Sequence, residues 1–306
     1  MSFATIPFAQ CEPLLDWQAL GDALVAGHEL PPAQIEDSLI RRRNDTLLSR
    51  AAWIDGLGLA VKSATIFPGN AEAGKPTVNG GVSLYSDNDG TLEAVLDFHL
   101  VTKWKTAGDS LLAARKLARP DSGRILIVGS GTVAHSLRDA YGSLFPTAEF
   151  TVWSRSEISA RRFAEAHPGT KVLTDLETAV RGADIVTCAT MASDPLIRGA
   201  WVQPGQHIDL IGAYRPDMRE ADDEAMRRAR VFVDSRDTTL EHIGELIAPL
   251  KSGAISYDDI VADFYDMASG KFARQSDDEI TLFKNGGGAH LDLMTSRYIL
   301  DAWRAR

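Results

Sequence analysis

The sequence predicts an α/β protein with a doubly wound parallel sheet and a smaller α+β domain, and three observations predict it. From residue 121 to about 234, short apolar runs alternate with helical patterns, as do the strands and crossover helices of a parallel sheet. Within residues 81–97, two alternating apolar runs flank Asn88-Asp89-Gly90, a strong hairpin signal. Between these two regions, residues 118–123 contain the proline and glycine that typically follow a helix.

The second half of the chain predicts a regular order of elements. We expect strands at 124–128, 149–154, 184–189, 207–211 and 230–233. Helices are expected between them at 132–143, 157–167, 175–181 and 219–229. The connections are short enough for right-handed crossovers.

The flanking regions predict a different organisation. In the first half we expect helices at 15–26, 31–42 and 109–118 around an antiparallel or mixed sheet. Beyond residue 235 the chain is expected to be mostly helical, with amphipathic spacing over 241–250 and 257–268 and a last helix over 288–306.

Composition sets the general class of the protein. A chain of 306 residues is long enough for two domains. Its net charge of −10 argues against nucleic acid or an anionic membrane as a partner. The two cysteines are far apart and no histidines have metal-ligand spacing, so no metal is expected. The absence of a signal-like start and of an apolar run of about 18 residues predicts a cytoplasmic protein.

The strongest functional signal is an apolar strand that runs into a glycine-rich turn over residues 129–134 and then into a helix. Gly129 permits the tight turn, Gly131 lets the backbone approach a pyrophosphate, and Ala134 allows close helix packing. Unpaired N–H groups at the helix start favour an anion. The pattern predicts a Rossmann-type dinucleotide site; the alternative is an ordinary strand-to-helix turn.

The tip of the second strand of this domain predicts which nucleotide binds. A carboxylate there would bind a ribose 2′-hydroxyl, whereas an arginine suits a 2′-phosphate. The chain has Ser154-Arg155-Ser156, and an arginine fork pairs with phosphate through charge-assisted bonds. NADPH or NADP+ is therefore expected in preference to NADH or NAD+, unless Arg155 is simply a solvated residue at a helix start.

Several further blocks accompany the turn in a fixed order. They are Gly58-Leu-Ala-Val-Lys62, Phe67-Pro-Gly-Asn70, Leu96-Asp97, Val101-Thr102, Lys105-Thr-Ala-Gly-Asp-Ser110, Cys188-Ala-Thr190, Ile211-Gly-Ala-Tyr-Arg-Pro-Asp217 with Arg219-Glu220, and Asp277-Asp-Glu-Ile-Thr-Leu-Phe-Lys284. Together they resemble the family of ornithine cyclodeaminase and mu-crystallin, which also includes archaeal-type alanine dehydrogenase and bacterial cyclic ketimine reductases.

The resemblance covers nearly the whole chain and implies its domain plan. It implies a substrate-binding and dimerisation domain at 1–120, to which the helix 288–306 returns, and an NAD(P)-binding domain at 121–287. A homodimer is the implied assembly.

Two lysines are implied site residues. By resemblance, Lys62 is the active-site lysine that binds a substrate carboxylate or transfers a proton; its position at the end of an apolar strand also suits a solvated terminus. Lys105 stands where most relatives carry a carboxylate-binding arginine, just before an expected helix start. A lysine keeps the charge but loses the bidentate geometry, and a surface position is the alternative. If the two lysines are close, repulsion and burial should lower the pKa of one.

Tyr214 stands where ornithine cyclodeaminases place an aspartate. With an ordinary pKa near 10, a tyrosine is not an anion at neutral pH, which disfavours cyclodeamination. Tyr214 could donate a hydrogen bond or act as an acid, and a structural aromatic is the alternative.

The remaining expected site residues follow from position. Arg43, in the Arg41-Arg42-Arg43 cluster, lies in the region of a family arginine, although a surface cluster explains it equally well. Asn70 is expected in the substrate pocket or in a turn. The expected cofactor contacts are Gly129, Ser130, Gly131, Thr132, Val133, Ser154, Arg155, Ser156, Thr190 and Lys284, the last with a helix hinge as its alternative.

These observations and the resemblance imply an NADP(H)-dependent reductase of cyclic ketimine carboxylates. Delta1-pyrroline-2-carboxylate or delta1-piperideine-2-carboxylate would give proline or pipecolate. The alternatives are an ornithine cyclodeaminase that recycles NAD+, an alanine or N-alkyl amino acid dehydrogenase, and an NADPH-dependent binding protein without catalysis.

Overall fold

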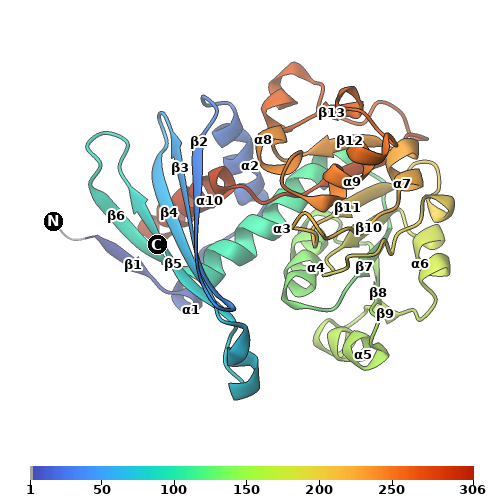
Figure 1. Cartoon of the computed structure of the whole chain (residues 1–306), viewed down its shortest axis with the longest axis horizontal. Coiled ribbons are helices and arrows are strands. Elements are labelled where there is room, and N and C mark those ends of the chain that lie inside the picture. Colours follow the sequence, from blue (N-terminus) through green and yellow to red (C-terminus); the bar gives the residue numbers. More distant parts are fainter. Residues whose placement is uncertain (1–2) are drawn as a thin grey trace. The chain divides into compact units, whose positions relative to one another are not determined.

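The computed structural model describes residues 3–306, and the chain divides into two compact units (Figure 1). Unit 1 comprises Met1–Lys105 and Gly287–Arg306, and unit 2 comprises Thr106–Gly286. The division falls inside helix α3 (Phe98–Leu117), ahead of the predicted boundary near residue 120. The later turns of α3 belong with unit 2, where the Ser110 hydroxyl donates to Asp209 at 3.0 Å.

A mixed six-stranded sheet forms the framework of unit 1. Its strands lie in the order β1-β6-β5-β4-β3-β2, with β1 parallel to β6 and the other pairs antiparallel. They are β1 (Ala4–Ile6), β2 (Gln34–Arg42), β3 (Asp45–Ile54), β4 (Gly58–Ile66), β5 (Val78–Tyr85) and β6 (Leu92–Asp97). The predicted hairpin around residues 88–90 is confirmed as β5 and β6.

The helix predicted over 31–42 is wrong, because this segment is the edge strand β2. It pairs with β3 along its whole length, from Gln34 opposite Trp53 to Arg42 opposite Asp45. Arg43, at φ +56°, lies in the turn between them. Pairing with a neighbouring strand has overridden a local pattern that suited a helix.

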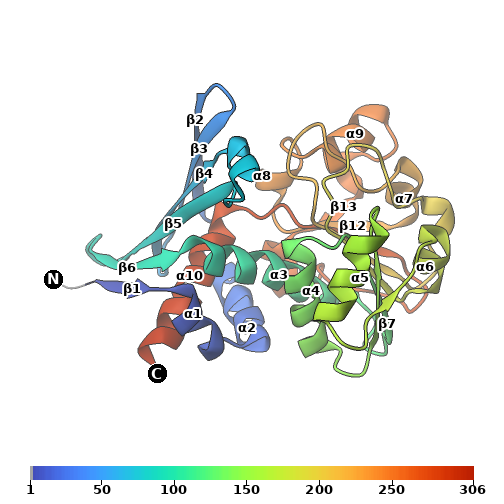
Figure 2. The ribbon, with the colours of Figure 1, turned by 90° about the horizontal axis from the view of Figure 1, so that it is seen from below.

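Among the residues that the structure describes, four helices complete unit 1, namely α1 (Phe8–Cys11), α2 (Trp17–His28), the start of α3, and α10 (Ala289–Arg304). Short 3-10 turns occur at η1 (Glu12–Leu14) and η2 (Pro68–Ala73). Helices α2 and α10 match the predictions at 15–26 and 288–306. Helix α10 packs against β3, β4 and α2 (Figure 2).

Helix α3 begins earlier than predicted. The Asp97 carboxylate accepts hydrogen bonds from the backbone N–H groups of His99 and Leu100 at 2.8 and 3.0 Å. This cap starts the helix directly after β6, so the predicted helix 109–118 is only its second half.

Unit 2 is a doubly wound α/β domain, as predicted. Its eight strands are all parallel, in the order β13-β12-β14-β11-β10-β7-β8-β9. They are β7 (Arg124–Val128), β8 (Glu149–Trp153), β9 (Lys171–Val172), β10 (Ile185–Cys188), β11 (His207–Leu210), β12 (Arg230–Val233), β13 (Ile260–Ala262) and β14 (Thr281–Lys284). The central strands are buried along nearly their whole length, which explains their continuous apolar runs.

Helices flank this sheet. They are α4 (Thr132–Leu144), α5 (Glu157–Ala166), α6 (Leu176–Gly182), α7 (Asp223–Arg228), α8 (Arg236–Thr239) and α9 (Gly244–Ser252), with 3-10 turns at η3 (Gly199–Trp201), η4 (Tyr257–Asp259) and η5 (Phe264–Ser269). Buried residues of α6, α7 and α9 join the strands in one apolar core.

Two helix predictions in unit 2 need correction. The segment 257–268 is not a helix but two 3-10 turns around β13, because Ser256 and Asp263 each form a capping box that restarts the backbone. The helix predicted over 219–229 is shorter, since Asp222 caps it by accepting from the Ala225 N–H at 2.9 Å. Strands β9, β13 and β14 were not predicted.

Among residues 3–306, no helix combines the length and apolar character that crossing a bilayer requires. Within the same residues, no group of three or more histidine, cysteine, aspartate or glutamate side chains is arranged to hold a metal ion.

Candidate functional site

The glycine-rich turn of unit 2 lies between the end of β7 and the start of α4. Gly129 has φ +111°, and an added Cβ would lie 2.7 Å from the Ala189 carbonyl oxygen. Gly131 is extended, and apart from its two chain neighbours no described residue has an atom within 4 Å of the position of an added Cβ. The fold itself requires the first glycine, whereas the second leaves open space beside the backbone.

The start of α4 is suited to an anion. No side chain caps its first N–H groups, and its N-cap is Gly131. These groups and the helix dipole favour a negative charge. The open cradle and the uncapped helix of thirteen residues therefore fit the pyrophosphate of a nicotinamide dinucleotide.

The tip of β8 is joined to this turn. The Gly129 N–H donates to the Trp153 carbonyl at 2.8 Å, and the Ser130 hydroxyl donates to Ser154 at 3.1 Å. Ser156 caps α5 by accepting from the Ser159 N–H at 3.3 Å. Arg155, between these serines, is exposed, so its guanidinium is accessible to a ligand.

A buried carboxylate organises the next loops of this sheet edge. Glu220 accepts hydrogen bonds from the backbone N–H and hydroxyl of Thr190, at 2.7 and 2.8 Å. Its other oxygen accepts from the Gly212 N–H at 2.6 Å. A Cβ at Gly212 would lie 1.8 Å from the Thr190 carbonyl oxygen, so the two loops are in contact. The structure thus fixes Thr190, an expected cofactor contact, after β10.

Glu245 lies beneath Glu220 in the same network. Its carboxylate accepts from the backbone N–H groups of Glu220 and Ala221 at 2.7 and 2.9 Å. Burial, and then the charge of Glu220, raise the pKa of Glu245 from 4.5 to about 7, while Lys284 and the two N–H groups oppose the rise. The folded protein therefore holds a proton there that an unfolded chain releases at lower pH.

Glu245→Gln is expected to change how stability depends on pH. Between pH 4.5 and about 7 the folded wild type binds one more proton at this site than the unfolded chain. Its stability should therefore fall as pH rises, by about 1.4 kcal/mol per pH unit from this group. The free energy of unfolding, measured with urea across this pH range, should fall by this amount in the wild type and not in the variant. Parallel pH dependence of the two proteins would contradict the assignment.

Lys284, another expected cofactor contact, lies inside the sheet. Its side chain is 0% exposed, and its ammonium donates to the Leu210 carbonyl at 2.9 Å. This placement gives Lys284 a role in joining β14 to β11. Its contact with a cofactor stays a prediction.

In unit 1, Lys62 lies within β4 rather than at its end, because the strand continues to Ile66. Its side chain is buried, and Nζ donates to Asp292 Oδ1 at 2.8 Å. The same nitrogen lies 4.9 Å from the ring centroid of Phe98. A solvated lysine at a strand terminus, the alternative from sequence, is therefore excluded.

Lys105 belongs to the same buried group. It lies inside α3 and not before a helix start, since the Asp97 cap begins the helix at Phe98. Its ammonium donates to the Gly287 carbonyl at 2.9 Å, and the guanidinium of Arg50 donates to the same oxygen at 2.9 Å. Arg50 is also paired across the sheet with Lys62.

The charges of this group are unbalanced. Three cations, Lys62, Lys105 and Arg50, act on the buried carboxylate of Asp292. Arg50 is also paired with the exposed carboxylate of Asp37 at 3.0 Å, so the group has three cations and two carboxylates. Burial lowers the pKa of Lys62 to about 8, with Asp292 opposing the shift and the two other cations adding to it. A site with surplus positive charge favours a further carboxylate, which a substrate would supply.

Arg50 and Asp292, two members of this group, were not predicted from the sequence. Arg50 stands in the middle of an otherwise weakly polar strand, and an arginine at such a position was the available signal. Asp292 was part of a predicted helix start, where an acidic residue has a local explanation. Arg43, which was expected near Lys62, lies instead in the exposed β2–β3 turn.

Asn70 and Tyr214 lie outside this group of buried charges. Asn70, in η2, donates to the Pro76 carbonyl at 2.9 Å. This contact fits the alternative prediction, that Asn70 is a turn residue. Tyr214 is 57% exposed in the loop after β11, and the guanidinium of Arg215 lies 5.5 Å from its ring centroid. Their proposed roles stay predictions.

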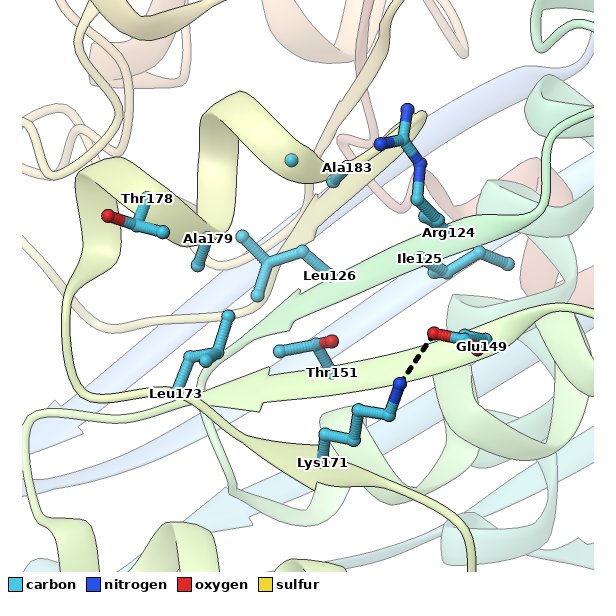
Figure 3. Close-up of a pocket in the computed structure, with 11 residues that line it drawn as sticks. Arg124, Ile125, Leu126, Glu149, Thr151, Lys171, Leu173, Thr178, Ala179 and Ala183 are labelled. Atoms are coloured by element: carbon cyan, nitrogen blue, oxygen red, sulfur yellow. Dashed lines mark hydrogen bonds and ion pairs between the residues drawn. The ribbon is translucent and has the colours of Figure 1, made fainter.

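A cavity of about 150 Å³ also occurs in unit 2 (Figure 3). Arg124 and Glu149, at the starts of β7 and β8, help to line it. The glycine-rich turn follows the other end of β7, so the cavity lies away from that turn. Lys171 pairs with Glu149 at 2.6 Å, and Arg124 pairs with Asp184 at 2.7 Å. With its charges neutralised, the cavity has no feature of a nucleotide or substrate site.

Comparison with known proteins identifies the family of this chain. The model of the ornithine cyclodeaminase/mu-crystallin family matches residues 51–306. A Delta(1)-pyrroline-2-carboxylate reductase of Paracoccus denitrificans is 52% identical over 93% of this chain and 92% of its own. The ketimine reductase mu-crystallin of Mus musculus is 35% identical, and the match covers 80% of this chain and 76% of the mouse protein.

A solved structure is similar over the whole chain. It is the Delta(1)-pyrroline-2-carboxylate reductase of Thermococcus litoralis in complex with NADH and L-proline, which is 26% identical. The structural match covers 99% of this chain and 98% of the Thermococcus chain, with a TM-score of 0.90. On its fold, its glycine-rich turn and these matches, this chain belongs to the ornithine cyclodeaminase/mu-crystallin family.

Proposed function

We propose that this chain, an NAD(P)H-dependent oxidoreductase acting on C=N bonds, reduces cyclic ketimine carboxylates with NADPH. Delta1-pyrroline-2-carboxylate and delta1-piperideine-2-carboxylate would give proline and pipecolate. The observation that carries the proposal is the group of three cations, Lys62, Lys105 and Arg50, which surround buried Asp292 and exceed the carboxylates of Asp292 and Asp37 by one charge. The names of the relatives from Paracoccus and Thermococcus support the substrate class.

Lys105 and Arg50 are the residues proposed to hold the substrate carboxylate. Both already donate to one carbonyl oxygen, that of Gly287, so their donors converge. A lysine and an arginine together supply several N–H donors for a carboxylate. Their convergence would fix the orientation of a planar imino acid.

Lys62 is proposed to give a proton to the substrate nitrogen. When bound, the nicotinamide supplies a hydride to the imine carbon. The electron pair of the C=N bond then moves to nitrogen, which takes a proton from the Lys62 ammonium. With a pKa of about 8, Lys62 is mostly protonated at neutral pH and close to the range in which an acid transfers its proton readily.

The test is an assay of NADPH oxidation with five- and six-membered cyclic imine carboxylates, beside ornithine with NAD+. We expect turnover of the imines and none of ornithine, because Tyr214 replaces the aspartate that the cyclodeaminases carry. Release of ammonia from ornithine without net reduction would instead establish a cyclodeaminase. Binding of NADPH with no turnover of any imine, alanine or N-alkyl amino acid would indicate a binding protein.

Arg155→Ala is expected to lower kcat/KM for NADPH by about 10- to 100-fold and to leave that for NADH nearly unchanged. One charge-assisted contact with the 2′-phosphate would be lost. Arg162→Ala, which removes an exposed charge from helix α5 just after this loop, is the matched control. Equal losses with both nucleotides, or a wild type that prefers NADH, would contradict the preference for NADP(H).

A homodimer is proposed through the sheet of unit 1. The edge strand β2 exposes Leu39 and Ile40 at 54% and 64%, and Trp53 on β3 is 47% exposed. An unpaired edge with large apolar side chains is suited to association. Light scattering of the purified protein measures the assembly directly.

A further inference from the structure

We propose that Asp292 is the positioning residue of Lys62, holding the ammonium in place and keeping it protonated for transfer to the substrate nitrogen. The inference rests on the proposed function. It adds a residue whose effect on catalysis passes through Lys62.

The contact joins two distant parts of the chain. Lys62 comes from β4 and Asp292 from the first turn of α10, and Nζ lies 2.8 Å from Oδ1. The two side chains are 8% and 2% exposed. Because α10 packs directly on β3 and β4, the carboxylate reaches the lysine from the helix that covers this face of the sheet.

Of the charged groups among residues 3–306 that act most on Lys62, Asp292 is the one that favours its ammonium form. Burial, Lys105 from α3 and Arg50 from β3 all favour the neutral amine. His290, beside Asp292 on α10, is held neutral, because burial and then the nearby His28, Lys105 and Arg50 put its pKa well below its ordinary value. Without the carboxylate, the remaining groups would release the proton at a lower pH.

The second oxygen of Asp292 strengthens the case. Oδ2 is buried, and no hydrogen-bond donor reaches it among the described residues. Buried acceptors normally have a partner, so this oxygen is placed to accept from a group that enters the site. The N–H formed on the substrate nitrogen is such a donor.

A purely structural role for Asp292 predicts a different outcome. The ion pair could simply fasten α10 to the sheet, as Glu93 does through Arg297 and Arg304 at 2.6 and 3.0 Å. Glu93 is not among the charged groups that act on Lys62. Glu93→Gln is therefore a matched control that removes a carboxylate of β6 paired with α10 and leaves the lysine unaffected.

The experiment measures kcat for imine reduction against pH in the wild type, Asp292→Asn and Glu93→Gln. In the wild type, kcat should fall as pH rises through about 8, when Lys62 loses its proton. In Asp292→Asn this fall should occur about 1–3 pH units lower, the usual effect of removing a close opposite charge. The fall in Glu93→Gln should coincide with that of the wild type.

A second variant covers the case in which Asp292→Asn does not fold. Asp292→Ser leaves a smaller polar side chain, and added formate should move its pH profile back towards that of the wild type. Coincident pH profiles of the wild type and either Asp292 variant would overturn the inference. A wild type that reduces no imine would instead refute the proposed function, so the two failures are distinguishable.

Discussion

Replacing Lys62 by alanine is expected to lower kcat for imine reduction by about 10²- to 10⁴-fold, the usual contribution of a positioned proton donor. The affinity for NADPH should remain that of the wild type, because the glycine-rich turn belongs to the other compact unit of the chain. Steady-state assays with a cyclic imine carboxylate and titration of NADPH fluorescence measure the two quantities separately.

The variant needs a control for folding. Removing Lys62 leaves the Asp292 carboxylate buried without its hydrogen-bond donor, and breaking one side of a buried ion pair typically costs about 3–5 kcal/mol. The double variant Lys62→Met with Asp292→Asn removes both charges and should regain stability without regaining turnover. A Lys62→Ala enzyme that keeps kcat within about tenfold of the wild type would show that another group supplies the proton.

Replacing Gly131 by valine is expected to raise the Kd for NADPH by about 5- to 150-fold, equivalent to about 1–3 kcal/mol. The added side chain would occupy the open space beside the uncapped start of α4, where the pyrophosphate is expected. Gly131 has φ −84° and ψ −175°, an extended conformation that valine adopts without strain. Thermal unfolding without nucleotide should therefore change little, by no more than the preference of a helix N-cap for glycine over valine.

Gly129→Ala provides the contrasting case in the same turn. At φ +111°, with the Ala189 carbonyl 2.7 Å from an added Cβ, it should lower the thermal midpoint even without nucleotide. If Gly131→Val binds NADPH as tightly as the wild type, the nucleotide does not lie along this turn. If Gly129→Ala is as stable as the wild type, the turn is less constrained than its geometry indicates.

Sequence alone predicted the doubly wound unit well, because its signals are local. The strands β7, β10 and β11 are buried over nearly their whole length, so each is a continuous apolar run between turns. The edge strand β2 was misread as a helix, because its residues are exposed and its conformation depends on pairing with β3. The segment 257–268 was misread for a related reason, since two capping boxes and pairing with β12 decide its backbone.

The same contrast between local and long-range determinants separates the glycine-rich turn from the buried charges around Lys62. Sequence by itself determined the turn, because Gly129 and Gly131 act through the backbone conformation of a few adjacent residues. Tertiary structure alone decided the group around Lys62. Arg50 and Lys62 meet through the register of β3 and β4, and Asp292 joins them because α10 packs on that sheet. Such contacts depend on the packing of segments far apart in the chain, which local residue patterns do not predict.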